Sequence, residues 1–272
     1  MSLNNETKKK IKVLNDRGAM GWDTEFICRN KSTGEVLFKT HNKLVIGGAT
    51  FTLEKISGVT AAFKAPTLNK LLGIEGPDAG QDHLGPLRDE KICMLVIGLD
   101  GSGDAFGEVV AVDYKTAHIP LEKIVPFRYL KPDHGQLLTE YCMKKMVNGY
   151  EAYYGKRIIS TPVIKSYFAD GTPVSNDVAT SPKKEEIDTY LEYQFDVSKA
   201  DAREFFEAEK GGIKNCRINT IALYTGVPVT MKEEGDRIEI ADARMLSKIN
   251  FNNEALDDDV KELDFIYRIY IK

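Results

Sequence analysis

The chain has 272 residues, of which 42% are apolar and 29% charged, and its formal net charge is −4 at pH 7. This composition argues against a disordered chain and against a strong overall field for nucleic acid. The longest apolar runs, such as 93–97, are strand-sized and far shorter than the roughly 20 residues of a membrane-spanning helix. No apolar segment like that of a signal peptide follows Lys8–Lys10. We therefore expect a folded protein made in a cytoplasm, with no membrane partner and no specific nucleic acid.

The four cysteines lie far apart, and none belongs to a C-x-x-C pair. Each sits among apolar or aromatic residues, so four buried thiols are expected rather than two disulfides. No two of these cysteines and the four histidines have the spacing of zinc ligands. The sequence therefore predicts no metal site and no cofactor. The residues concerned are Cys28, Cys93, Cys142, Cys216, His41, His83, His118 and His134.

The first part of the chain predicts an arm at 1–20, followed by a hairpin and a helix. Two strand-like runs, Thr24–Cys28 and Glu35–Lys39, are separated by a turn rich in Asn, Ser and Gly. A short helix is expected over 50–56, ending at Gly58. One side of this helix would pack on the core through Phe51, Leu53 and Ile56.

Residues 58–90 contain many prolines and glycines and show little periodicity. This composition predicts a long loop or extended arm. Such loops commonly contact a partner or a neighbouring subunit, and the alternative is a mobile surface excursion. Both interpretations remain open at this point.

A glycine-rich segment at 98–107 separates a buried strand at 91–97 from a strand at 108–112, its expected hairpin partner. A phosphate loop would need a helix after the glycines, but a strand follows. A calcium loop has three of its oxygen ligands but lacks the turn glycine and the bidentate glutamate. The calcium-loop positions are Asp100, Ser102, Asp104, Ala105 and Ala111. We interpret the segment as a hairpin loop.

Two further clusters could carry chemistry. Asp133 and His134, close to Arg128 in sequence, could form an acid/base cluster, but one adjacent pair fixes no geometry, and a turn is the favoured interpretation. A tyrosine cluster precedes Gly155-Lys156-Arg157 and could stack on nucleic acid or sugar. Strand or interface residues are favoured there, because no wide basic field surrounds them. The tyrosines are Tyr150, Tyr153 and Tyr154.

The region after residue 157 predicts two strands and the firmest helix of the chain. A strand pair at 157–168 is interrupted by Pro162, and 186–197 alternates as a strand. Ser198 is expected to cap a helix that ends at Gly211-Gly212. The acidic residues there, and a later acidic run, are more typical of solvated surface than of paired catalytic carboxylates or a cation site. They are Asp201, Glu204, Glu207 and Glu209, and the run Asp257–Asp259.

The final third predicts strands at 217–224, 237–240 and 245–251, with a turn at 225–228, and a closing strand at 263–271. In the closing strand one face is apolar, with Phe265, Tyr267, Ile269 and Ile271, and the other is mixed. We expect a mainly β fold, a β-sandwich-like domain or domains with a few short helices and a long Pro/Gly-rich loop. Residues 21–272 would form one β-rich domain or two subdomains divided near 115–150.

Six segments of the chain are familiar, namely 33–38, 42–49, 125–128, 202–206, 217–221 and 265–270. They resemble segments of the virion structural proteins of large tailed bacteriophages. The resemblance implies a non-enzymatic building block of the virion, in the neck or tail, that contacts copies of itself and other virion proteins. It brings no catalytic residues. A capsid-associated cementing protein is the nearest alternative, and a carbohydrate-binding or hydrolase module using 98–107 and the tyrosines is a different class.

Overall fold

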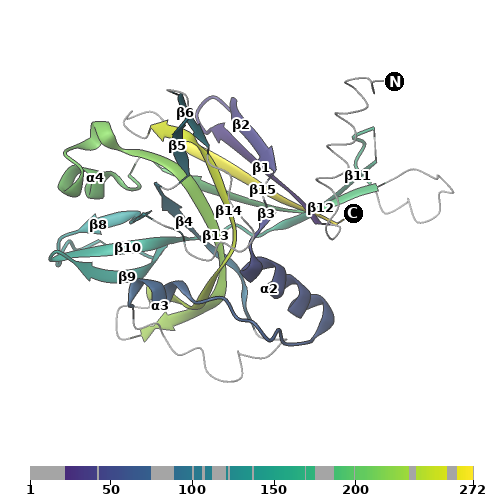
Figure 1. Cartoon of the computed structure of the whole chain (residues 1–272), viewed down its shortest axis with the longest axis horizontal. Helices are drawn as coiled ribbons and strands as arrows, with labels where there is room; N and C mark the ends of the chain where they lie inside the picture. The colour runs from purple at the N-terminus through teal and green to yellow at the C-terminus, as the bar shows by residue number, and fades with distance from the viewer. Residues whose placement is uncertain are drawn as a thin grey trace.

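The computed structural model describes residues 22–41, 43–74, 89–99, 101–105, 108–111, 121, 123–136, 138–168, 170–174, 187–198, 200–232, 237–255 and 262–271. They form two large antiparallel sheets, a small hairpin and three short α-helices (Figure 1). The predicted fold class, mainly β and β-sandwich-like, is confirmed. None of the described helices is long and apolar enough to cross a membrane. The expected arm at 1–20 and the acidic run Asp257–Asp259 lie outside the described residues.

The closing strand is the centre of a five-stranded sheet. The strand order is β11 (Val163–Phe168), β12 (Ile187–Val197), β15 (Leu263–Ile271), β1 (Trp22–Asn30) and β2 (Val36–His41). β15 forms nine residue pairs with β1 and nine with β12. Phe265 and Tyr267 are fully buried, as the alternation predicts. The expectation that this segment is fixed into a sheet is confirmed.

The second sheet has eight strands. Its main order is β3 (Lys43–Leu44), β14 (Arg237–Ala255), β13 (Arg217–Met231), β4 (Lys91–Gly98), β10 (Tyr150–Arg157) and β8 (Arg128–Leu130). β7 (Ile124–Val125) pairs with β4, and β9 (Tyr141–Val147) pairs with β10. The expected turn at 225–228 is wrong, because β13 continues through it with a register shift between Thr225 and Val227. β14 likewise joins two expected strands into one, with Asp242 at a φ of 52°.

The strand at 91–97 has different partners from those expected. β4 pairs with β13, β10 and β7, while β5 (Ser102–Ala105) forms a separate hairpin with β6 (Glu108–Ala111). A continuous apolar run is buried on both faces of a sheet, which suits a central strand rather than one arm of a local hairpin. The expected strand pair at 157–168 is also wrong, since β10 and β11 belong to different sheets.

Each face of the eight-stranded sheet carries a core. The first core lies between the two sheets and contains Phe26 and Phe265 from one sheet and Leu95 and Ile221 from the other. The second core lies on the opposite face and includes Leu68 of α3 (Leu68–Leu72). Residues 58–74 are therefore only partly the long loop that was expected, because α3 interrupts them and packs on the sheet.

The remaining helices lie at the sides of the sheets. α2 (Ile46–Ser57) ends at Gly58 in a left-handed conformation, as predicted. It starts earlier than expected, and a Cβ at Gly48 would lie only 2.1 Å from the Leu246 carbonyl oxygen, so glycine permits α2 to contact β14 closely. α4 (Arg203–Glu209) is followed by a 3-10 turn at Ile213–Asn215. Ser198 is not its cap, because the residue preceding the helix is Ala202.

Candidate functional site

A polar pocket of about 320 Å³ opens beside β9 and β10. Glu151 accepts hydrogen bonds from Tyr153 Oη at 2.9 Å and His134 Nε2 at 3.3 Å, and its other oxygen lies 2.8 Å from Lys144 Nζ. His134, one of the histidines singled out in the sequence, thus meets an acidic partner in this pocket. The lining residues are His134, Gln136, Leu138, Thr139, Lys144, Glu151, Tyr153 and Arg237.

The hydrogen bonds of His134 fix its tautomer. The backbone N–H of Gln136 donates to His134 Nδ1 at 2.9 Å, so Nε2 carries the proton that is donated to Glu151. Burial acts to raise the pKa of Glu151, but the bonds from Lys144, Tyr153 and His134 outweigh it and lower that pKa. Glu151 is therefore an ionised carboxylate bound by three donors, an arrangement that suits structural support better than proton transfer.

Arg128 binds partners other than Asp133 and His134, the residues with which the sequence grouped it. Its guanidinium donates to Glu204 at 2.7 Å and to Gln136 at 3.0 Å, while Asp133 is exposed in a turn with a φ of 65°. The turn interpretation of residues 133 and 134 is confirmed. The helix carboxylates are not all solvated, because Glu204 joins α4 to β8 and Glu209 accepts from Tyr129 Oη at 2.7 Å. They bind cations and hydroxyls of the sheet rather than one another.

Asp201 forms the most deeply buried charged group of this region. It is fully buried, accepts from Lys156 Nζ at 2.9 Å and from Tyr141 Oη at 2.7 Å, and also accepts from the Ser198 amide. Lys156 itself is only 5% exposed. Burial and the nearby charge of Asp201 raise the pKa of the Tyr141 phenol. This network joins the turn before α4 to β9 and β10.

The tyrosine cluster is divided among different surroundings. Tyr150 stacks on Tyr129 with ring centroids 4.5 Å apart, Tyr153 is buried in the first core, and Tyr154 packs against the second core. Because β-strand neighbours face opposite sides of the sheet, these rings do not form one stacking platform. Their interpretation as strand residues is confirmed.

All four cysteines are buried free thiols, as predicted. Burial raises the pKa of Cys93 to about 12, so its thiol remains protonated near neutral pH. His41 lies 3.0 Å from Asp23 on the exposed part of β1 and β2. Within the described parts of the chain, no three His, Cys, Asp or Glu residues are arranged to hold a metal ion. His83, His118 and Asp100 lie outside those parts.

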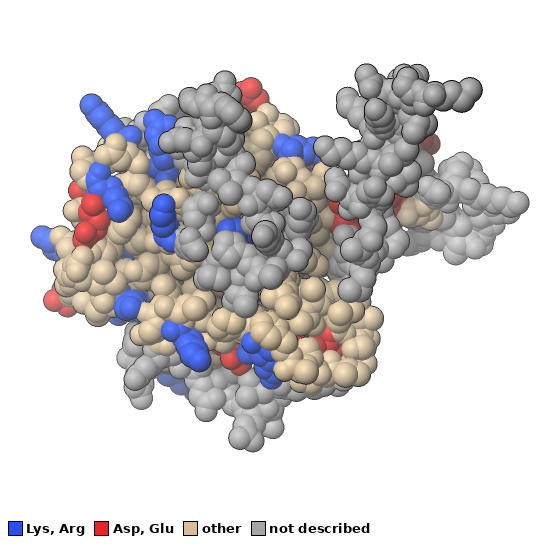
Figure 2. Space-filling model, viewed as in Figure 1, with Lys and Arg blue, Asp and Glu red and all other residues tan. Residues whose placement is uncertain are grey.

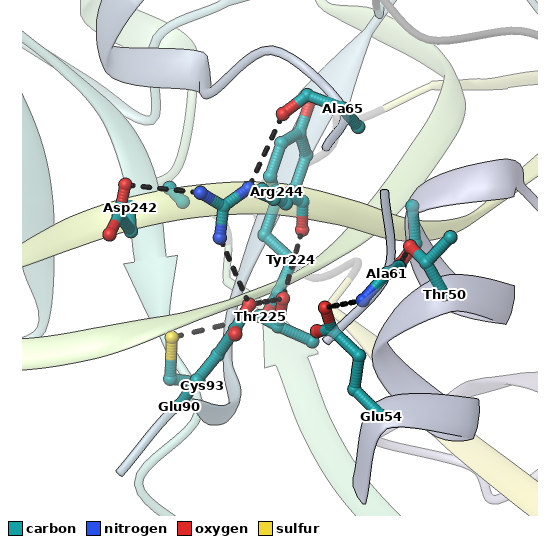
Figure 3. Close-up of polar contacts among 12 residues, drawn as sticks. Thr50, Glu54, Ala61, Ala65, Glu90, Cys93, Tyr224, Thr225, Asp242 and Arg244 are labelled. Atoms are coloured by element: carbon teal, nitrogen blue, oxygen red, sulfur yellow. Dashed lines mark hydrogen bonds and ion pairs between the residues drawn. The ribbon is translucent and has the colours of Figure 1, made fainter. Parts of the chain in front are cut away.

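A buried polar cluster fixes the segment after α2 to the eight-stranded sheet (Figure 3). Glu54 accepts from the Ala61 amide at 2.8 Å, and Arg244 Nε donates to the Ala65 carbonyl oxygen at 3.3 Å. Arg244 also lies 3.2 Å from Asp242 and 3.7 Å from Glu90. The Glu54 contact joins the segment to α2, and the Arg244 contact joins it to β14. The surface formed by residues 46–65 is thus held in a defined position.

This surface, which we call the helix lobe (residues 46–65), exposes apolar side chains. Leu53 and Ile56 were expected to face the core, but they are 45% and 66% exposed, and Phe51 alone of the three packs on the first core. Val59 and Phe63 are exposed beside them. The area over α2, at the lower right of Figure 2, accordingly carries few charged atoms. Clustered exposed apolar side chains are typical of interaction surfaces.

A second apolar group lies along the edge strand of the five-stranded sheet. We call it the edge patch, and it comprises Ile159, Val163, Ile164 and Ile187. The strand register puts Ile164 and Ile187 on the core-facing side of the sheet, and Val163 on the outer side together with Glu192. Ile164 is 73% exposed, the largest value among the exposed apolar residues described. The helix lobe and the edge patch together contain eight of the eleven exposed large apolar side chains of the described residues. Exposed apolar side chains are therefore concentrated in these two groups rather than scattered over the described residues.

The outer face of the five-stranded sheet carries a row of alternating charges, which we call the charge ladder. It runs Lys39, Glu25, Arg268, Glu192 and Lys165, across all five strands. The nitrogen to oxygen distances lie between 2.6 and 3.0 Å. Arg268 lies on the mixed face of the closing strand, where it binds the two carboxylates of the neighbouring strands. Its interactions are therefore intramolecular.

The charge ladder predicts an acid-dependent loss of stability. Burial acts to raise the pKa of Glu25 and Glu192, but bonds and charges from Lys39, Arg268 and Lys165 lower both values below the usual range. Groups with a lowered folded-state pKa stabilise the fold above the unfolded value of about 4.3, and this stability is lost as pH falls through the folded pKa.

Thermal melts of the wild-type protein should therefore show a falling melting temperature between about pH 5 and pH 3. Arg268→Gln should make that slope shallower, because it removes the cation between the two carboxylates. Arg29→Gln is the matched control, since Arg29 pairs with the more exposed Asp264. An unchanged slope in Arg268→Gln would contradict the assignment.

No protein-family model, no curated protein and no solved structure matches this chain. The arrangement itself must therefore suggest the function. The described charged clusters are internally paired, whereas the helix lobe and the edge patch present unpaired apolar surface. Among the described residues, the helix lobe and the edge patch are accordingly the candidate functional surfaces.

Proposed function

We propose that the protein is a non-enzymatic structural subunit of a bacteriophage virion, assembling with copies of itself and with other virion proteins in the neck or tail. The resemblance of its segments to virion structural proteins of large tailed phages supports this proposal. The observation that carries it is the concentration of exposed apolar side chains in the helix lobe and the edge patch. Subunits that contact more than one neighbour need more than one such surface.

The polar pocket favours this proposal over the hydrolase alternative. Glu151 is bound by three donors, His134 has both ring nitrogens engaged, and Arg237 pairs with Glu239. A general base needs a free lone pair directed at the substrate. The tyrosines needed for sugar stacking are used within the sheet and its two cores. Neither group supports the carbohydrate-binding or hydrolase alternative.

The test is direct observation of the purified full chain. Negative-stain microscopy and mass photometry over a range of concentrations should show rings, tubes or defined oligomers. Decoration of capsids in a mixing experiment, without self-assembly, would favour the cementing protein instead. Isolated monomers that bind glycans would contradict both structural proposals.

A further inference from the structure

We propose that His134 makes the turn at residues 131–136 sensitive to pH: the neutral ring holds the turn closed, and the charged ring releases it. The turn follows β8 and supplies two lining residues of the polar pocket, His134 and Gln136. Its contacts lie within one chain, so this switch does not depend on the proposed role in a virion.

The two ring nitrogens of His134 have opposite roles. Nδ1 accepts the backbone N–H of Gln136 at 2.9 Å, and Nε2 donates to Glu151 at 3.3 Å. A charged imidazole carries a proton on both nitrogens and accepts no hydrogen bond. Protonation therefore replaces the bond at Nδ1 with two N–H groups that face each other. The bond at Nε2 remains and becomes charge-assisted.

The turn is the part that gives way, because the ring is held more firmly. The His134 side chain is only 13% exposed, and its partner Glu151 is also bound by Lys144 and Tyr153. Gln136 is exposed, and its side chain accepts from Arg128 at 3.0 Å. Release of the turn therefore also separates Gln136 from Arg128 and opens this wall of the pocket to solvent.

The surrounding charges act on the ring in both directions. Glu151 favours the charged ring, and it stays ionised because bonds from Lys144, Tyr153 and His134 outweigh its burial and lower its pKa. The pocket cations oppose a further positive charge. Histidines change charge between about pH 8 and pH 5, so the Gln136 contact is present at the upper end of this range and lost as the pH falls through it. The groups around the ring are Glu151 and Tyr153 of β10, Lys144 of β9 and Arg237 of β14, with Asp133 before it in the turn and Arg128 of β8 bound to Gln136.

Hydrogen exchange of the full chain, read by mass spectrometry, tests the switch. Protection of peptides that contain Gln136, corrected for the intrinsic pH dependence of exchange, should fall about two- to tenfold on acidification, the effect of losing one hydrogen bond. The comparison is made at about pH 7.5 and about pH 5.5, within the range in which histidines titrate. Peptides from β10 should keep their protection, because their ladder bonds do not involve His134.

His134→Asn is the decisive variant. An asparagine side chain accepts the amide two residues further on, as in an Asx-turn, and does not titrate. The turn should therefore stay protected at both pH values. His41→Asn is the matched control, since His41 lies beside Asp23 on β1 and should leave the pH dependence unchanged. Glu151→Gln should move the midpoint to lower pH, because the charged ring loses its anionic partner.

Equal protection of the turn at both pH values in the wild-type chain would overturn the proposal. A loss that persists in His134→Asn would also overturn it, because another group would then be titrating. If that variant does not fold, the wild-type titration and Glu151→Gln decide. A midpoint that Glu151→Gln leaves unchanged would contradict the coupling between the ring and the carboxylate.

Discussion

Deletion of residues 265–272 is expected to abolish the cooperative unfolding transition of the protein. β15 lies at the centre of the five-stranded sheet, so its loss separates β1 and β2 from β12 and β11. It also removes Phe265, Tyr267 and Ile269, which are at most 7% exposed. Each such side chain contributes about 1.5–3 kcal/mol, against about 5–15 kcal/mol for a whole domain. Differential scanning calorimetry of the truncated chain would measure the effect.

Single substitutions in β15 test the same expectation one side chain at a time. Tyr267→Asp should unfold the protein, because it places a charge in the first core. Arg268→Asp should also reduce stability, since it would add a third carboxylate between Glu25 and Glu192. A truncated chain that melts cooperatively with an unchanged melting temperature would show that the segment is dispensable.

The second large effect is expected for Asp201→Ala. This change leaves the Lys156 ammonium, 5% exposed, without its closest carboxylate and removes the acceptor of Tyr141 and Ser198. Breaking a buried ion pair in this way costs about 3–5 kcal/mol. Chemical denaturation, with the midpoint and slope fitted together, would measure the loss.

A double variant distinguishes the loss of the hydrogen bonds to Asp201 from the cost of leaving the buried Lys156 charge without its carboxylate. Asp201→Ala with Lys156→Met should be more stable than Asp201→Ala alone, because the buried ammonium is replaced by an apolar side chain of similar length. Tyr141→Phe is the milder control and should cost about 0.5–1.5 kcal/mol. Equal stability of the single and double variants would mean that Asp196, 3.7 Å from Lys156, compensates fully.

Local sequence patterns correctly predicted elements that pack one face against the core. The alternation in β15, the turn of the first hairpin and the glycine stop of α2 were all readable, because each depends on neighbours in sequence. The segment 225–228 was misread, since Thr, Gly and Pro together are typical of a turn. In the structure β13 pairs with β4 only as far as Gly226, so Pro228 lies in an edge portion where no N–H is required on the open side.

The exposed apolar surface of the helix lobe could not be predicted from the sequence, because the pattern does not show which apolar residues face solvent. Phe51, Leu53 and Ile56 are equally apolar, and the pattern alone does not say which of them the close contact at Gly48 turns toward the core. The charge ladder and the Asp201 network join side chains far apart in the chain. Composition shows the charges, but only the strand register shows which of them meet.

Pairing of β1 with β15 has a consequence for how the protein is made. Glu25 and Arg268 are hydrogen-bonded although 243 positions separate them in the chain. β1 therefore cannot pair with β15 until the last strand of its sheet has been synthesised. Until then, one edge of β1 lacks its partner strand. Long-range pairing of this kind slows folding and exposes intermediates to aggregation. Chaperone supply during expression should accordingly limit the yield of soluble protein more strongly than the stability of the finished fold.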